Sequence, residues 1–97
     1  MNKNKFHDFK ALNEKILLNA ENFVENLIPK GKKSRNEWIA LNPTRDDKNM
    51  GSFRINLISG KWADFATGDK GSDLISLYAY IKKCSQYEAF KKIGGIA

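Results

Sequence analysis

Apolar residues recur at helical spacing in the first third of the chain. Between Asp8 and Ile28 they lie three or four positions apart, the spacing that gathers side chains on one face of an α-helix. They are Phe9, Leu12, Ile16, Ala20, Phe23, Val24, Leu27 and Ile28. Pro29 follows directly, and proline disrupts a helix because it lacks an N–H and clashes with the preceding turn. The pattern predicts one N-terminal helix within residues 1–29.

The middle of the chain alternates between apolar and polar residues, as half-buried strands do. "EWIAL" at residues 37–41 is a short candidate strand, "SFRINL" at 52–57 a second and "KWADF" at 61–65 a third. The intervening "ISGK" is typical of a turn, so the second and third strands are expected to form a hairpin.

A two-residue turn at Ser59 and Gly60 would set the register of this hairpin and pair Leu57 with Trp62. The other pairs would be Ile58 with Lys61, Ile55 with Asp64 and Arg54 with Phe65. One face would then carry Phe53, Ile55, Leu57 and Trp62, expected in the core, and the other Arg54, Asn56, Lys61 and Phe65. A one-residue slip would exchange the two faces. A basic face that carries an aromatic ring suits single-stranded nucleic acid, since cations hold phosphates and rings stack on bases.

Two further helices are predicted near the C-terminus. Ser72 is placed to cap the first of them, with Asp73 in its first turn. Its apolar stripe consists of Leu74, Leu77, Tyr78 and Ile81. Ser85 and Glu88 form a capping box at the start of a last short helix, "QYEAFKKI".

The order of these elements predicts an α+β fold, with a small antiparallel sheet flanked by an N-terminal helix and two C-terminal helices. The 97 residues suit a single domain with one modest core, in which a basic loop at residues 30–36 joins the helix of residues 1–29 to a core at 37–97. No apolar run reaches the roughly 18–20 residues needed to cross a membrane, and the N-terminus lacks the hydrophobic segment of a signal peptide. We therefore expect a cytoplasmic location and no membrane partner.

The net charge of +6 is unevenly distributed. Residues 29–36, "PKGKKSRN", contribute four positive charges without an acid, whereas residues 1–28 and 37–71 are each balanced. Clustered lysine and arginine gain affinity for nucleic acid because they release the counterions condensed on phosphates. A solvated linker that keeps the protein soluble is the alternative explanation.

A long stretch of the chain, "NPTRDDKNMGSFRINLISGKWADFATGDKGSDLISLYAY", resembles the N-terminal zinc-ribbon domain of bacterial, phage and plasmid DNA primases. The resemblance spans roughly Trp38 to Ile93 and is carried by "DKNMGSFRI", "DFATG" and "GSDLISL" in that order. It implies a zinc-ribbon-like sheet and contact with a single-stranded template.

The chain departs from that family at the metal site. The family has a Cys-x-x-His pair and a Cys-x-x-Cys pair, and the matching positions here are Asn42, Arg45, Asp64 and Thr67. An arginine cannot ligate zinc, and the single cysteine, Cys84, is too few for a multi-cysteine zinc site. The resemblance therefore implies a ribbon without metal or other cofactor. We expect Asn42, Arg45 and Asp64 to reach across the former site, with an Arg45–Asp64 pair in place of the metal.

The loop "FATGDKG" would keep the shape of a metal knuckle without the metal. Gly68 and Gly71 are expected to supply backbone conformations with positive φ. Alternatively, the start of the following helix at Ser72 binds a phosphate with help from Lys70. Asp69 and Asp73 count against that alternative because they repel an anion.

By resemblance, the cations of the ribbon half are expected to contact the template: Arg45, Lys48, Arg54, Lys61 and Lys70. The basic loop adds Lys32, Lys33 and Arg35. The alternative is that these cations are simply solvated and balanced by nearby acids. Trp62 is expected in the core rather than stacked on a base, and Trp38 fits either position.

Catalysis by this chain is not expected. Acid–base or two-metal chemistry needs carboxylates that converge on one point, whereas Asp46 and Asp47 are adjacent and point apart in an extended chain. The catalytic domain of the primases relies on a Glu and an Asp-x-Asp motif, which this sequence lacks. The sequence thus predicts a non-catalytic, single-stranded DNA-binding domain for the replication of a phage, plasmid or mobile element, with replication proteins as possible partners.

The alternative function is a protein-interaction or inhibitor module derived from such a ribbon. A domain that has lost its zinc site can also have lost the ability to bind a template strand. The first helix would then present apolar surface to a protein partner through Phe6, Phe9, Phe23 and Val24.

Overall fold

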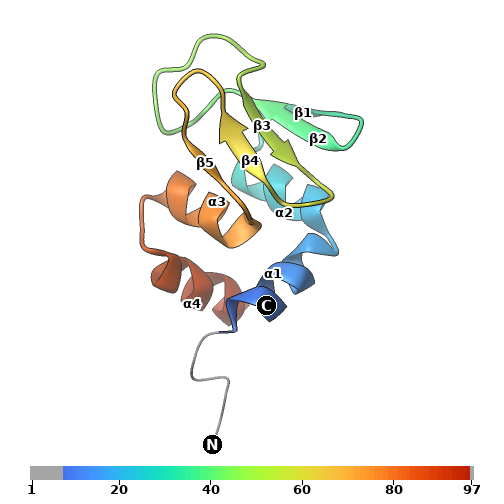
Figure 1. Ribbon diagram of the computed structural model, residues 1–97, viewed down its shortest axis with the longest axis vertical. Helices are drawn as coiled ribbons and strands as arrows, with labels where there is room; N and C mark the ends of the chain where they lie inside the picture. Colours follow the sequence, from blue (N-terminus) through green and yellow to red (C-terminus); the bar gives the residue numbers. More distant parts are fainter. Residues whose placement is uncertain (1–7, 97) are drawn as a thin grey trace, which may run out of the picture.

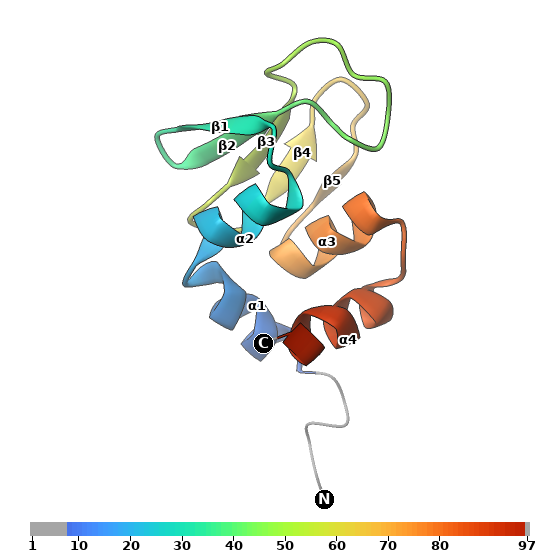
Figure 2. The same cartoon turned by 180° about the vertical axis from the view of Figure 1, so that it is seen from behind.

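The computed structural model describes residues 8–96 and confirms the α+β class. Its helices are α1 (Phe9–Leu17), α2 (Ala20–Leu27), α3 (Leu74–Lys82) and α4 (Gln86–Ile96). Its strands are β1 (Gly31–Ser34), β2 (Glu37–Ala40), β3 (Phe53–Asn56), β4 (Trp62–Asp64) and β5 (Lys70–Gly71). Helices α2 and α3 lie against one face of the sheet, and α1 and α4 lie beyond them (Figures 1 and 2).

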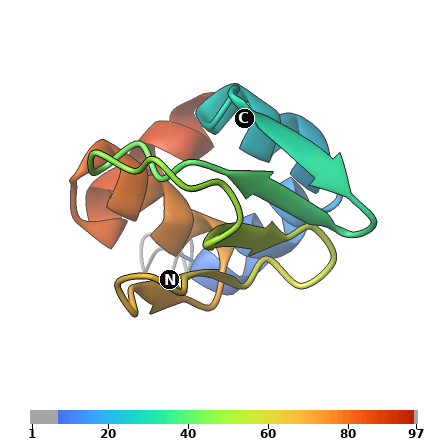
Figure 3. The same cartoon turned by 90° about the horizontal axis from the view of Figure 1, so that it is seen from above.

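The sheet is an antiparallel meander in which each strand pairs with the next strand along the chain, in the order β1-β2-β3-β4-β5. Seen from the sheet end of the molecule, the strands lie in front of the helices (Figure 3). The sheet therefore has an inner face toward α2 and α3 and an outer face that none of the described helices covers.

The inner face of the sheet carries the main core. Trp38, Ile55 and Trp62 form one row across β2, β3 and β4, and all three are buried. They pack with Phe53 and with side chains from α2 and α3, including Val24, Ile28, Leu74 and Leu77. The predicted core face of the hairpin is thus confirmed, and both tryptophans belong to the core.

A second core joins α1, α3 and α4. It contains Leu12, Ile75, Ala79, Ala89 and Ile93, with the partly buried Cys84 packed against it. Around it the Phe9 ring lies 4.8 Å from that of Phe90, and the Phe23 ring 6.4 Å from that of Tyr78.

This packing covers most of the apolar surface that the first helix was expected to offer a partner. Val24 is fully buried, and Phe9 and Phe23 are partly buried against α4 and α3. Phe6 lies outside the described residues. The described part of the first helix therefore does not present the predicted apolar face.

The predicted single N-terminal helix is two helices. The chain turns at Leu18 and Asn19, whose N–H groups bond to carbonyls only three residues back, and Asn19 has a non-helical φ of −133°. The turn sends α1 toward α3 and α4 and places α2 under the sheet. The apolar spacing runs through the break almost unchanged, which is why the pattern did not reveal it.

The predicted basic loop at 30–36 is largely a strand. Lys32 and Lys33 lie in β1, which pairs with β2 through a tight turn at Arg35, where φ is +56°. An edge strand that faces water needs no apolar residues, and lysines there discourage pairing with other chains. The strand consequently lacked the alternating apolar signal.

The β3–β4 hairpin has a longer turn than predicted. Ile55 pairs with Trp62, because the Asn56 side chain accepts hydrogen bonds from the N–H groups of Ile58 and Ser59 and so starts the turn early. Gly60 completes it with a φ of +81°. The predicted register was wrong by two residues, and an even shift keeps each side chain on its predicted face.

Helix α3 begins one residue later than predicted. Its N-cap is Asp73, which accepts a hydrogen bond of 2.8 Å from Ser76 N–H, so Ser72 is not the cap. The predicted capping box of α4 is confirmed by reciprocal bonds between Ser85 and Glu88 of 3.1 and 3.0 Å.

Of the two glycines in the loop before α3, one behaves as predicted. Gly68 has a φ of +85°. Gly71 has no positive φ but lies in β5, where a Cβ would fall 2.5 Å from both the Trp62 indole nitrogen and the Ser76 hydroxyl. A close approach, rather than an unusual backbone conformation, requires glycine at that position.

Candidate nucleic-acid interface

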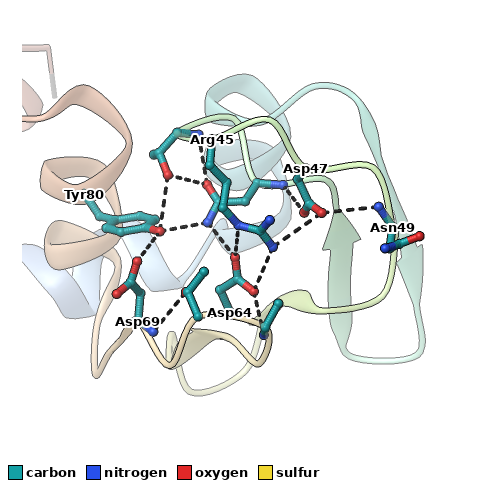
Figure 4. Close-up of polar contacts among 10 residues, drawn as sticks. Arg45, Asp47, Asn49, Asp64, Asp69 and Tyr80 are labelled. Atoms are coloured by element: carbon teal, nitrogen blue, oxygen red, sulfur yellow. Dashed lines mark hydrogen bonds and ion pairs between the residues drawn. The ribbon is translucent and has the colours of Figure 1, made fainter.

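Asn42, Arg45 and Asp64, three of the four residues that the primase resemblance would place at a metal site, meet at the end of the sheet where β2 and β4 finish (Figure 4). Asp64 is fully buried and accepts from Arg45 Nε at 2.9 Å and from Arg45 Nη2 at 3.3 Å. Asn42 Nδ2 donates to the same carboxylate at 2.8 Å, and the Ala66 N–H at 2.9 Å. The Arg45–Asp64 pair expected from the sequence is therefore present.

The pair is joined to helix α3 and to the loop after β2. The Tyr80 hydroxyl lies 2.7 Å from Asn42 Nδ2 and donates to Asp69 Oδ2 at 2.8 Å (Figure 4). On the other side, Asp47 accepts from the Asn42 N–H at 2.9 Å and lies 3.4 Å from the Arg45 guanidinium. The cluster thus joins two loops to helix α3 through polar contacts.

Asp64 stays ionised in this setting. Burial acts to raise its pKa, but the hydrogen bonds from Arg45, Asn42 and the Ala66 N–H outweigh burial and lower the pKa to about 2. The hydrogen bond with Asp64 in turn raises the pKa of Arg45. The cluster is therefore a charged, hydrogen-bonded cross-link.

Thr67, the fourth matching position, does not join the cluster through its side chain. It is exposed, and its hydroxyl accepts from the Asp69 N–H at 3.2 Å. Within residues 8–96, no three His, Cys, Asp or Glu side chains are grouped so as to hold a metal ion.

The outer face of the sheet carries a row of residues that crosses all five strands. The pairing aligns Lys32, Ile39, Arg54, Ala63 and Lys70. The three cations lie on alternate strands. Strands are about 4.8 Å apart, so neighbouring cations of the row are anchored about 10 Å from one another.

A shallow pocket of about 210 Å³ lies beside this row. It is lined by Glu37, Arg54, Asn56, Lys61, Trp62, Ala63 and Phe65. Phe65 is 73% exposed. Arg54 is held by Glu37 Oε1 at 2.9 Å and donates to the Gly51 carbonyl at 2.8 Å. Of the strand residues on this face, all of them within the described range, Glu37 alone is acidic.

Four of the eight cations predicted to bind nucleic acid share this outer face: Lys32, Arg54, Lys61 and Lys70. We call them, with Phe65, the outer-face patch.

The other four predicted cations are not brought together with the patch. Lys33 lies on the helix side and pairs with Glu21 at 3.1 Å, and Arg35 occupies the β1–β2 turn. Arg45 belongs to the buried cluster, while Lys48 lies 3.8 Å from Asp46 in an exposed loop.

The start of α3 is a poor phosphate site. The Asp73 carboxylate already accepts from the Ser76 N–H, and Lys70 is aligned with Ala63 on the outer face.

The sequence did not indicate that Glu37 belongs to this surface. Its place among the cations follows only from the pairing of β2 with β3.

Comparisons of this chain with protein-family models, with curated proteins and with solved structures found no match. None of the helices within the described residues is both long enough and apolar enough to span a membrane.

Proposed function

We propose that this protein is a non-catalytic nucleic-acid-binding domain that holds a single strand, DNA by preference, on the outer-face patch. The observation that supports this most directly is the row of Lys32, Arg54 and Lys70 beside an exposed Phe65. Cations release counterions from phosphates, and an exposed ring offers a surface on which a base can stack.

A single strand suits this surface better than a duplex. Stacking on Phe65 requires an unpaired base with an open face, which a duplex does not offer outside its ends. The row of cations is also short, since it crosses only five strands. A segment of a few nucleotides would span it.

The role that agrees with both the patch and the sequence is template binding for a primase. If the resemblance to primase zinc ribbons holds, the hairpin and its cations belong to the part of the domain that contacts the template. Under this proposal the Arg45–Asp64 cluster fixes the loops that the metal fixes in those domains. The protein would act in the cytoplasm, in replication of a phage, plasmid or mobile element, with a separate catalytic domain or protein making the primer.

The proposal is tested by fluorescence anisotropy of a labelled single-stranded DNA, with duplex DNA and single-stranded RNA as competitors. Each phosphate contact on a single strand contributes about −0.7 to the slope of log affinity against log salt. The three lysines of the patch should therefore give a slope of about −2, and a further contact by Arg54, which is paired with Glu37, would bring it to about −3. Absence of binding to any oligonucleotide at low salt would refute the proposal and favour the protein-interaction alternative, whose affinity should depend little on salt.

A further inference from the structure

The pocket in the outer-face patch is of a size that suits a single ring rather than a larger ligand. Its volume of about 210 Å³ lies below the roughly 300–1,000 Å³ of pockets that enclose drug-sized ligands. Ala63 contributes a small side chain to its lining, and the exposed Phe65 ring stands beside it. A nucleobase stacked on Phe65 would cover Ala63 and bring its polar edge toward the remaining lining residues.

Glu37 determines which part of a nucleic acid can occupy the pocket. Its carboxylate repels phosphate, whereas the cations of the patch attract it. A strand bound to the patch would therefore place its phosphates near Lys32, Lys61 and Lys70 and a base near Glu37. Arg54 holds Glu37 Oε1 at 2.9 Å, which fixes the carboxylate and leaves Oε2 open.

The hydrogen-bonding groups of the pocket form a definite pattern. An ionised carboxylate only accepts, so Glu37 requires donors from the ligand. Asn56 lies directly opposite Glu37, and its oxygen is used by the N–H groups of Ile58 and Ser59. Its NH₂ group bonds to nothing within residues 8–96 and remains a donor. The pocket thus offers a carboxylate acceptor next to an amide donor.

Guanine matches this pattern best among the bases. The bases of single strands are read along their Watson–Crick edges, where guanine presents two adjacent donors, N1–H and the N2 amino group, next to the O6 acceptor. Adenine, cytosine and thymine each place an acceptor beside the donor, and a second carboxylate oxygen would repel it. We propose that the pocket binds one base of the strand and selects guanine, an inference that rests on the proposed function.

The test compares short, labelled oligothymidylates in which one central thymidine is kept or replaced by deoxyguanosine, deoxyadenosine, deoxycytidine or deoxyinosine. A well-placed carboxylate contact should favour the guanine strand over the thymidine strand by about tenfold. Inosine keeps N1–H and O6 but lacks the N2 amino group, so most of the gain should disappear. Equal binding of the guanine and thymidine strands by the wild type would overturn the inference.

A charge-matched pair of variants assigns the preference to Glu37. Glu37→Gln should abolish guanine selection while it tightens binding of the thymidine strand, because the variant removes a negative charge and releases Arg54. Glu21→Gln makes the same charge change on the helix side, where Glu21 pairs with Lys33, and should keep the guanine preference. Guanine selection that survives in Glu37→Gln would refute the inference.

The two proposals fail in distinguishable ways. If every strand binds with the same affinity, the proposal of single-strand binding is supported and the proposal of guanine selection is refuted. If no strand binds at low salt, both fall. Circular dichroism checks that each variant is folded. We expect Glu37→Gln to fold, because Glu37 is partly exposed and its replacement leaves the core intact.

Discussion

Arg45 holds Asp64 through two hydrogen bonds, from Nε at 2.9 Å and from Nη2 at 3.3 Å, at the point where β4 ends. Asp64 is fully buried, while the Arg45 side chain keeps 31% of its surface exposed. The charge of the carboxylate is thus compensated inside the protein, and the guanidinium remains in partial contact with water. A cross-link of this kind depends on both partners and on the surrounding amide donors.

Removing the Asp64 carboxylate should destabilise the domain strongly. In Asp64→Ala the buried Asn42 amide loses one of its two acceptors and Arg45 keeps only its longer contact with Asp47, so we expect the free energy of unfolding to fall by about 3 kcal/mol. Chemical denaturation measures this value. The control is Asp46→Ala, because Asp46 is 88% exposed and should change stability by less than about 0.5 kcal/mol. Equal effects of the two variants would contradict the assigned role of the cluster.

The same residue should make stability sensitive to acid. The folded-state pKa of Asp64 is lowered from 3.8 to about 2, so its contribution is complete above the unfolded-state pKa and is lost as the pH falls toward 2. This contribution is about 2 kcal/mol. Unfolding free energies of wild type and Asp64→Asn, measured from about pH 5 to pH 2, should converge as the pH falls. Asp46→Asn should follow the wild type, and a constant gap between wild type and Asp64→Asn would exclude this linkage.

Gly71 should tolerate no side chain. A Cβ there would lie 2.5 Å from both partners of the hydrogen bond between the Trp62 indole and Ser76. Gly71→Ala should therefore cost about 1–3 kcal/mol through overpacking. Gly94→Ala is the matched control in α4, where no other described part of the protein comes within 4 Å of the new Cβ, and it should stabilise by about 0.5–1 kcal/mol. Thermal unfolding measures the stability of both variants. A Gly71→Ala variant as stable as the wild type would contradict the close approach at this position.

Two neighbouring lysines should differ in their effect on binding. Lys32 is aligned with Arg54 across the outer face, whereas Lys33 faces the helices and pairs with Glu21. Lys32→Ala should weaken single-strand binding and reduce the magnitude of the salt slope by about 0.7. Lys33→Ala carries the same charge change and should leave the slope unaltered. A larger effect from Lys33 would place the binding surface on the other face.

Chelation of metal should not alter the thermal unfolding of this domain. The guanidinium of Arg45, which takes a ligand position under the proposed likeness to primase ribbons, repels cations, and Asp64 is already saturated with hydrogen bonds. We therefore expect the same unfolding temperature with and without EDTA and no bound zinc by atomic absorption. Stoichiometric zinc in the purified protein would contradict this prediction.

The sequence was sufficient where the chemistry of the individual residues indicates whether they are buried or paired. The alternation of Phe53, Ile55 and Trp62 predicted the core face, an inference that rests on hydrophobicity alone. The Arg45–Asp64 pair was predicted from the resemblance to primase ribbons, which put these two residues at neighbouring ligand positions, together with their opposite charges.

The sequence was insufficient where neighbouring elements decide the outcome. Strand β1 has no apolar residue, so only its pairing with β2 identifies it. The break between α1 and α2 leaves the helical spacing intact, and Glu37 joins the basic patch only through the register of β2 with β3. These features arise from contacts between different segments of the chain. The residue pattern within one segment does not predict such contacts.

The meander also has a consequence for folding. Each strand pairs with its neighbour in the chain, so the sheet can grow by closing short loops at little entropic cost. Helix α1 is different, because Asn13 accepts a hydrogen bond from the Ile75 N–H, 62 positions away. We expect α1 to dock last and to detach first, with faster amide hydrogen exchange than β3. Loss of α1 would then expose the apolar surface of α3 and α4 while the sheet and its outer face persist.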